Sequence, residues 1–230
     1  MQPYFFPYIG YFQLLAAVDR FVVYDDVTFI KQGWINRNRM LINGEAVFFT
    51  VPLANKSSST AIRDTAVSDA PEHRRWAEKL LKSFDNAYRR APHFAETYPV
   101  LERVLTNATS RVAELAVDSI RAVADRLQIS TPIVETSSVY GNADLHGEER
   151  VLAICRAEQA TRYVNVSGGR ELYSRERFAA EGIDLRFIQP RAIEYPQFGG
   201  PFVPWLSIVD VLMFNPVERV REFLGACEVS

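Results

Sequence analysis

MQPYFFPYIGYFQLLAAVDRFVVYDD, residues 1–26, contains a loop, a helix and a strand in that order. Two prolines and several aromatic rings make the first part irregular and stiff, and the apolar run from Ile9 to Val18 then predicts a helix. Residues 21–24 are β-prone, and Asp25 and Asp26 end that strand. A helix followed directly by a strand in this way is typical of an α/β protein.

The second half of the chain alternates between strand and helix patterns, which predicts a parallel or mixed sheet with flanking helices. A Rossmann-like or HUP-like arrangement of that sheet is left open. The expected elements are a strand near 132–135, a helix over 148–160, a strand over 162–166, a helix over about 175–181 that Gly182 ends, and a strand over 185–188.

Two further patterns complete a single expected α/β domain over residues 1–230. Asn43-Gly44 lies between two β-prone runs and predicts a hairpin within 40–51, because both turn residues tolerate a positive φ. Residues 72–128 carry apolar side chains at helical spacing and are expected to form a helical insertion or cap. The helices expected there and in the tail lie over 72–90, 94–105, 111–128, 206–214 and 216–224.

The composition excludes several classes of protein. The chain is 48% hydrophobic and 23% charged, its net charge is −2 and its cations are scattered, so general nucleic-acid binding is not expected. Cys155 and Cys227 have neither the number nor the spacing of a disulfide framework or a zinc site. The sequence shows neither a signal-peptide pattern nor a run of about 18 apolar residues. We therefore expect no membrane span and a cytoplasmic location.

Three residues are candidates for catalysis. Asp25 and Asp26 follow a predicted strand, and ligands of open α/β sheets bind outside the carboxyl ends of strands. Either acid can serve as a general base, or bind Mg²⁺ or a sugar hydroxyl; the alternative is a solvated turn pair. Adjacent carboxylates on an extended chain point in different directions, so only one is expected to face a site. His146 lies in a polar loop before a helix, although a loop histidine is usually just solvated.

The stretch KQGWINRNR, residues 31–39, is the most specific candidate for ligand binding. Arg37 and Arg39 project to one face if the chain is extended, where two guanidinium groups can clamp a phosphate or carboxylate. Trp34 can stack on a base or sugar beside them, whereas the alternative is an exposed sheet edge made soluble by charge. The residues expected to bind substrate here are Lys31, Trp34, Asn36, Arg37, Asn38 and Arg39.

Three other segments supply further candidates for substrate binding. The aromatic N-terminal loop can wall a pocket, or it can plug the end of a sheet as part of the core. Asn165 to Gly169 follows a predicted strand, and its backbone N–H groups can form a nest for an oxyanion, although Gly-Gly loops are also common connectors. The third segment is an aromatic stretch near residue 200, which supplies Tyr195 and Gln197. The candidates from the three segments are Gln2, Tyr4, Phe6, Gly10, Asn165, Ser167, Gly168, Gly169, Tyr195 and Gln197.

The chain resembles the WbqC-like family along nearly its whole length. The resemblance is close from QPYFFPYIGYFQLLAAVDRFVVYDDV through KQGWINRNR. It implies a few apolar residues before Gln2 that form a first strand, whereas this chain begins at Met1. Further matching stretches are FFTVPL at 48–53, AYRRAPHF at 87–94, TSS at 136–138, YVNVSGGRELY at 163–173, YPQF at 195–198 and FVPWLSIVDVLMFN at 202–215.

Members of that family tend to accompany the machinery for O-antigen and other surface glycans, so the resemblance implies a cytoplasmic step on a nucleotide-linked sugar. The leading hypothesis is a transferase that places an acyl or aminoacyl group on a nucleotide-linked amino sugar. Arg37 and Arg39 would bind a phosphate, and Asp25 or Asp26 would deprotonate the amine. The expected partner is a small phosphorylated or carboxylated molecule, while the cofactor and the oligomeric state are left unassigned.

Two alternatives stay open. Residues 6–11, FPYIGY, look like a degenerate HxGH turn of nucleotidylyltransferases with tyrosines in place of the histidines. The second hypothesis is accordingly an ATP-dependent ligase or nucleotidyltransferase-like enzyme, with Asp25 or Asp26 helping to hold Mg²⁺. The third is a non-catalytic binding protein of the polysaccharide machinery, with the aromatic loops as its partner surface.

Overall fold

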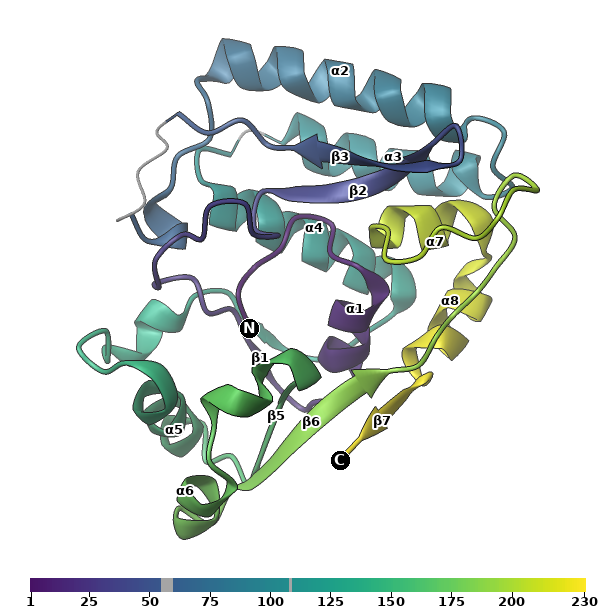
Figure 1. Ribbon diagram of the computed structural model, residues 1–230. Coiled ribbons are helices and arrows are strands. Elements are labelled where there is room, and N and C mark those ends of the chain that lie inside the picture. Colours follow the sequence, from purple (N-terminus) through teal and green to yellow (C-terminus); the bar gives the residue numbers. More distant parts are fainter. Residues whose placement is uncertain (55–59, 108) are drawn as a thin grey trace.

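The computed structural model spans residues 1–230 and describes residues 1–54, 60–107 and 109–230 (Figure 1). It is a mixed α/β protein, as the alternating pattern predicts. The helices are α1 (Ile9–Ala16), α2 (Ala70–Tyr88), α3 (Phe94–Thr106), α4 (Val112–Leu127), α5 (Gly147–Ala157), α6 (Arg175–Ala180), α7 (Ile208–Phe214) and α8 (Val217–Leu224). The strands are β1 (Phe21–Val22), β2 (Arg37–Ile42), β3 (Glu45–Thr50), β4 (Ile133–Val134), β5 (Arg162–Val166), β6 (Asp184–Pro190) and β7 (Cys227–Val229).

The described strands form three small sheets. β1 pairs in parallel with β4, and β2 pairs with β3 as an antiparallel hairpin. β5 pairs in parallel with β6, whose other edge carries the antiparallel strand β7. Small parallel and mixed sheets flanked by helices confirm the predicted fold class, while a Rossmann-like or HUP-like arrangement stays a prediction.

The hairpin turns at Asn43 and Gly44, as predicted. These residues have φ values of 51° and 82°, which is the left-handed backbone that a two-residue type I′ turn needs. In the resulting register Arg39 lies opposite Phe48. Because side chains alternate along a strand, Arg37 lies on the same side of the sheet as Arg39. The turn therefore decides which aromatic side chain faces the two arginines.

The three helices predicted between 72 and 128 are α2, α3 and α4. Asp69 caps α2 by accepting a hydrogen bond from the N–H of Glu72 (2.9 Å). Gln128 takes the left-handed conformation, with φ 56°, and ends α4. These local signals lie in the sequence itself, which is why the helix boundaries were predictable to within about two residues.

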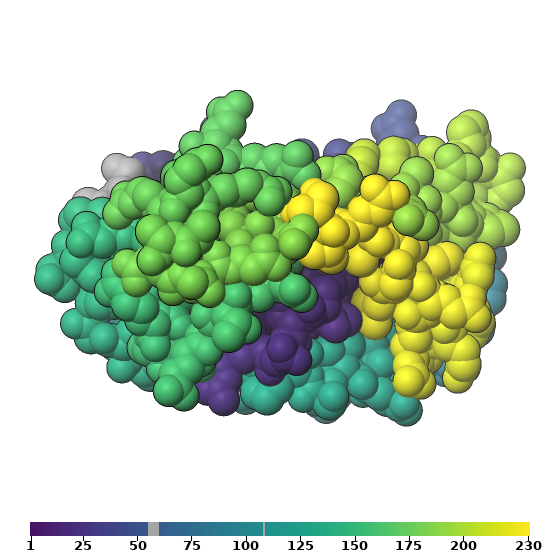
Figure 2. Space-filling view, turned by 90° about the horizontal axis from the view of Figure 1, so that it is seen from below, coloured from purple at the N-terminus to yellow at the C-terminus, as the bar shows by residue number. Residues whose placement is uncertain are grey.

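Two apolar cores hold the elements together. The larger one contains side chains of α1, the hairpin, α2, α3, α4, α7 and α8, including the fully buried Phe12, Phe84 and Leu115. The smaller one, with Phe178 and Cys155, joins α5, α6, β5 and β6. Helices α2 to α4 therefore share their core with the N-terminal elements, and a single domain stays a prediction. Figure 2 shows the purple N-terminal part of the chain recessed between green segments of the second half and the yellow C-terminal segment.

Three features differ from the sequence prediction. Residues 167–172 form a 3₁₀ helix directly after β5, where a loop was expected. β7 was not predicted, because its three residues are too short to carry an alternating pattern and it forms only by pairing with the edge of β6. β1 and β4 have two residues each, although the N–H of Val23 still donates to the carbonyl oxygen of Val134 (2.9 Å).

The backbone of Phe6 is held from three directions. Its N–H donates to Ser119 Oγ of α4 (2.9 Å). Its carbonyl oxygen accepts hydrogen bonds from Asn38 Nδ2 of β2 (2.8 Å) and from the hydroxyl of Ser207, which caps α7 (2.7 Å). Phe6 has φ 41°, a left-handed conformation that costs an L-residue about 1–2 kcal/mol. These bonds, which we call the Phe6 clamp, therefore hold a strained loop and tie it to α4, β2 and α7.

A second buried network surrounds Asp210 of α7. Its carboxylate accepts hydrogen bonds from the hydroxyls of Tyr88 (2.8 Å) and Tyr195 (2.7 Å) and from the side-chain amide of Gln197 (2.7 Å). The Tyr88 hydroxyl also accepts from the N–H of Leu41 (2.7 Å). Burial raises the pKa of the Asp210 carboxyl, although the hydrogen bonds act in the opposite direction. The network links α2, β2 and α7 through side chains that all have protein partners.

Asn38→Ala should destabilise the protein by about 2–4 kcal/mol, because it leaves the carbonyl of Phe6 and the N–H of Arg39 short of a partner in a buried setting. Urea unfolding followed by circular dichroism measures this loss. The matched control is Asn107→Ala, whose amide contacts Asp118 at an exposed position (2.8 Å), and it should cost less than about 1 kcal/mol. Equal and small effects of both substitutions would contradict the stabilising role of the Phe6 clamp.

Candidate functional site

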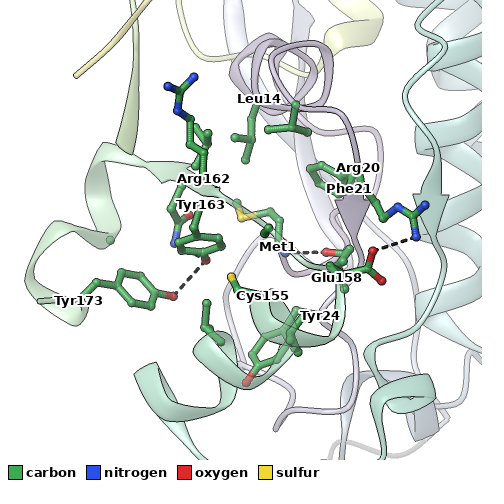
Figure 3. Close-up of a pocket in the computed structure, with 18 of the residues that line it drawn as sticks. Met1, Leu14, Arg20, Phe21, Tyr24, Cys155, Glu158, Arg162, Tyr163 and Tyr173 are labelled. Atoms are coloured by element: carbon green, nitrogen blue, oxygen red, sulfur yellow. Dashed lines mark hydrogen bonds and ion pairs between the residues drawn. The ribbon is translucent and has the colours of Figure 1, made fainter. Parts of the chain in front are cut away.

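A cavity of about 1250 Å³ lies between β1 and β5 (Figure 3). In this view Met1 lies between Phe21 of β1 and Tyr163 of β5. Side chains of α1 and α5 supply much of the apolar wall. Five of the predicted binding residues line the cavity, and they come from the N-terminal loop and from β5 and the 3₁₀ helix that follows it: Gln2, Tyr4, Asn165, Gly168 and Gly169.

The polar groups on the β5 side of the cavity bond to one another. Asn165 Nδ2 donates to the hydroxyl of Tyr163 (3.2 Å), which lies 3.5 Å from the hydroxyl of Tyr173. Asn165 Oδ1 accepts from the N–H of Val166 (2.7 Å). Burial raises the pKa of the Tyr163 hydroxyl well above its usual value, so this group stays neutral. A Cβ at Gly169 would lie 3.3 Å from Asn165 Nδ2, so a side chain there would press on the cluster.

Asp25 is buried at the carboxyl end of β1. Its Oδ1 accepts hydrogen bonds from the hydroxyl of Thr136 (2.9 Å) and from the N–H of Ser137 (3.1 Å), both of which follow β4. Burial raises the pKa of the Asp25 carboxyl, and the hydrogen bonds oppose that shift. A carboxylate with a raised pKa is a stronger base, so this environment suits the general-base role predicted for Asp25.

Asp26 has a different partner. Its Oδ2 forms an ion pair with Arg150 of α5, and its Oδ1 accepts a hydrogen bond from the hydroxyl of Ser137. The side chains of Arg150 and Asp26 are 3% and 2% exposed. Arg150 also donates to the side-chain oxygen of Asn142 (3.1 Å) and lies 5.0 Å from the ring centre of Tyr24. The Asp26 carboxylate is therefore held by a buried counter-ion and by a hydroxyl donor.

The third candidate for catalysis, His146, does not join this group. His146 precedes α5, is exposed and makes no capping hydrogen bond. Burial raises the pKa of Cys155 to about 11, so its thiol is protonated at neutral pH. Among residues 1–54, 60–107 and 109–230, no group of three or more His, Cys, Asp or Glu side chains is arranged to hold a metal ion. Within the same ranges no helix is long and apolar enough to cross a membrane.

A second group of residues forms an exposed face over β2 and β3. The guanidinium carbon of Arg37 lies 4.7 Å from the ring centre of Phe48, and that of Arg39 lies 5.5 Å from the ring of Trp34. The rings of Trp34 and Phe48 are 6.0 Å apart, and those of Tyr8 and Trp205 are 6.1 Å apart. We call this set the arginine–aromatic face: Tyr8, Trp34, Arg37, Arg39, Phe48 and Trp205.

Both arginines are oriented by backbone carbonyl groups. Arg37 donates from Nε to the carbonyl of Gly33 (3.0 Å) and from Nη2 to that of Gln32. Arg39 donates from Nη2 to the carbonyl of Trp205 (2.8 Å), which joins the hairpin to the segment before α7. A guanidinium group has five N–H donors, so each arginine can bind an anion while keeping these contacts.

The aromatic rings of this face are unusually open to solvent. Trp34, Phe48 and Trp205 are 39%, 51% and 62% exposed. Trp205 also has φ 60°, a strained left-handed conformation for a bulky residue. Such strain concentrates at functional sites, where the surrounding structure holds a side chain in one orientation. The face therefore offers flat apolar surfaces next to two fixed cations.

Several predicted binding residues have protein partners instead. Asn36 Nδ2 donates to the carbonyl of Val51 (2.9 Å). A Cβ at Gly10 would lie 2.3 Å from the ring of Tyr8, so a side chain there would have to displace that ring. Lys31 is exposed, and Ser167 is half-buried at the start of the 3₁₀ helix. Six of the predicted residues pack in the interior or make internal hydrogen bonds, and their contact with a substrate stays a prediction: Phe6, Gly10, Asn36, Asn38, Tyr195 and Gln197.

Several residues of these clusters were not selected as site residues from the sequence, among them Phe48, Arg150, Ser137 and Trp205. The signal for Phe48 was present, because the hairpin turn at Asn43-Gly44 determines that it faces Arg39. Ser137 and Trp205 lie in the family-matching stretches 136–138 and 202–215. The partners of Arg150, Ser137 and Trp205, however, are brought to them only by the tertiary fold.

Replacing Arg150 alone should cost about 3–5 kcal/mol of stability, since Arg150→Met leaves the Asp26 carboxylate buried without its counter-ion. The double variant Asp26→Asn/Arg150→Met should recover most of that loss. Arg156→Met is the control on the same helix, because its ion pair with Glu181 (3.0 Å) is exposed and should contribute less than about 1 kcal/mol. Guanidinium unfolding curves compare the variants, and similar losses for Arg150→Met and Arg156→Met would refute the buried pair.

Comparison with known proteins agrees with the sequence motifs. The sequence profile of the WbqC-like protein family matches residues 2–222. The chain is 30% identical over 230 residues to the uncharacterized protein Rv1507c of Mycobacterium tuberculosis, and the match covers 99% of this chain and 96% of that protein. No solved structure matches the chain. The matched residues include β1 to β6 and both clusters described above, and the chain belongs to the WbqC-like protein family.

Proposed function

We propose that this protein is a cytoplasmic transferase of O-antigen or other surface-polysaccharide assembly, and that it places an acyl or aminoacyl group on a nucleotide-linked amino sugar. The observation that supports this most is the arginine–aromatic face. Arg37 and Arg39 would contact the phosphates of the ligand, and Trp34, Phe48 and Trp205 would stack on its sugar or base.

The chemistry of this face suits an anionic, partly apolar ligand. Phosphate oxygens accept charge-assisted hydrogen bonds from guanidinium groups, and a bidentate contact fixes their orientation. The arginines are already held by the carbonyls of Gly33 and Trp205, so little side-chain entropy is lost on binding. Exposed aromatic rings stack well on the flat face of a base or on the C–H groups of a sugar.

The reaction needs a base as well as a binding face. In the proposed step the sugar amine attacks the carbonyl of an activated acyl donor, an amide bond forms, the donor's leaving group departs and the base takes the amine proton. Asp25 is better suited to this than Asp26, because Asp26 is neutralised by Arg150. A nucleotide-linked sugar is an extended ligand with separate phosphate and sugar ends, and the proposal requires that it extend from Arg37 and Arg39 to Asp25.

The first test is ligand binding followed by thermal denaturation and tryptophan fluorescence. A ligand at a hundred times its Kd stabilises by about 2.7 kcal/mol, which raises Tm by roughly 5–10 °C in a chain of this size. The panel comprises nucleotide-linked amino sugars, ATP with Mg²⁺, and acyl donors. We expect a nucleotide-linked amino sugar to raise Tm and to change the emission of the exposed Trp34 and Trp205.

Arg39→Gln should weaken that binding by about 10- to 150-fold, the equivalent of one charge-assisted contact worth about 1.5–3 kcal/mol. The matched control is Arg219→Gln, because Arg219 also lies over an aromatic ring, that of Phe223 (4.8 Å), but on α8. Equal affinity of Arg39→Gln and wild type would refute the arginine–aromatic face as the binding site. Stabilisation by ATP with Mg²⁺ alone would favour a ligase instead. A stable complex with a glycosyltransferase, without any ligand effect, would favour a non-catalytic binding protein.

A further inference from the structure

Helix α2 and its C-cap present a row of cations to solvent. Four exposed side chains recur at intervals of four, three and seven residues, which places them on one face of the helix: Arg75, Lys79, Lys82 and Arg89. The opposite face carries the side chains that α2 buries, which are His73, Ala77, Leu80, Leu81, Phe84 and Tyr88. The four cations therefore lie on the side of α2 that is farthest from the core, and we call them the α2 crest.

α2 is an outer element of the molecule. In Figure 1 it runs along the top edge, beyond the β2–β3 hairpin. At a rise of about 1.5 Å per residue, the crest is about 21 Å long from Arg75 to Arg89. A row of this kind at the edge of the molecule can meet a flat surface with all of its cations at once.

The protein itself leaves most of the crest unpaired. Arg89 forms an ion pair with Asp85 one turn earlier, but the other three cations form no ion pair with any residue that the structure describes. Exposed arginines elsewhere have carboxylate partners, as Arg156 and Arg191 do. The crest therefore keeps its positive charge available for an external anion.

The charge around α2 is opposite in sign to that of the rest of the chain. Residues 70–90 contain six cations and three acids, a net charge of +3, while the whole chain has a net charge of −2. The other residues thus carry a net charge of −5. An anionic surface attracts the α2 side and repels the remainder, which gives the protein one preferred orientation on that surface.

Two observations favour a lipid surface over a nucleic acid as the source of the anions. Within α2, which the structure describes completely, no large apolar side chain is exposed, and the exposed rings of Trp34 and Trp205 belong to other segments. The crest therefore has no platform on which bases could stack. A phosphodiester chain that extended past α2 would also meet the negative remainder of the protein, whereas a flat surface contacts the crest alone.

We propose that the α2 crest docks this protein on the surface of a bilayer rich in anionic phospholipids. The attraction is electrostatic: each Lys or Arg close to such a surface contributes modestly, and several together give a reversible contact that salt weakens. Because the crest has no apolar side chain to insert, the protein stays at the level of the lipid headgroups.

The docked orientation leaves the arginine–aromatic face open. Phe49 of β3 packs on Phe84 of α2, with ring centres 5.3 Å apart. Side chains alternate along a strand, so Phe48 and the two arginines beside it point away from α2. A ligand from solution can therefore reach them while α2 faces the lipid, and the docking proposal does not depend on the proposed function.

The test is co-sedimentation of the full chain with vesicles of phosphatidylcholine that contain about one third phosphatidylglycerol. We expect binding at low ionic strength and release in about 1 M salt, where the Debye length falls to about 3 Å. Vesicles of phosphatidylcholine alone should not bind. The variant Arg75→Gln/Lys79→Gln/Lys82→Gln should bind the anionic vesicles about 100-fold more weakly, because each cation near the surface changes the binding constant by about fivefold.

Two matched variants control for folding and for net charge. Arg156→Gln/Arg177→Gln/Arg191→Gln removes three exposed cations from the second half of the chain and should bind like the parent. The exchange of Arg for Lys at position 75 and of Lys for Arg at positions 79 and 82 keeps the charge of the crest. It should also bind like the parent, because a lipid surface responds to charge rather than to the geometry of one side chain. Gln, Lys and Arg all have good helix propensity, so α2 should fold in each variant.

The proposal would be overturned by a parent chain that does not bind the anionic vesicles, or that binds neutral vesicles equally well. Equal losses for the crest variant and for its control at positions 156, 177 and 191 would overturn it too. Binding of a single-stranded RNA at the same ionic strength, without binding of vesicles, would identify a nucleic acid as the partner instead. The crest variant should keep the rise in Tm that a nucleotide-linked amino sugar gives, so failure here is distinguishable from failure of the proposed function.

Discussion

The Phe6 clamp is the interaction on which the rest of the structure depends. Three buried side chains, from α4, β2 and the start of α7, fix one peptide unit in a left-handed conformation. The loop leaves this point in two directions, toward Met1 at the edge of β1 and toward Tyr8 beside Trp205. Both clusters of functional interest are therefore positioned by the same anchored loop.

The elements were largely predictable because their signals are local. Residues close in the sequence determine the alternation of strands and helices, the Asn43-Gly44 turn and the helical periodicity between 72 and 128. Each predicted element is present in the structure. The Phe6 clamp was not predictable, because Ser119 and Ser207 are far from Phe6 in the sequence. A resemblance to family motifs identifies such residues as a set, but it does not separate those that support the fold from those that meet a ligand.

The site residues divide in the same way. Strand alternation alone places Arg37 and Arg39 on one face of the hairpin. Trp205 joins that face only in the folded protein, where its carbonyl oxygen accepts a hydrogen bond from Arg39. The adjacent aspartates were expected to point in different directions, and they do: Asp25 bonds to Thr136, and Asp26 pairs with Arg150. Burial and charge then distinguish their surroundings, since burial raises the pKa of Asp25, whereas Asp26 is held in a buried ion pair with Arg150.

The two clusters differ in the kind of molecule they can accept. The cavity beside Met1 is walled largely by apolar side chains of α1 and α5, whereas the arginine–aromatic face presents two cations and exposed rings. The Asn165 side chain in the cavity wall is already engaged, because it bonds to the hydroxyl of Tyr163 and to the N–H of Val166. Asp25 lies at the carboxyl end of β1, where ligands of open parallel sheets bind. A ligand held by Arg37 and Arg39 would therefore have to extend to that edge for Asp25 to act as its base.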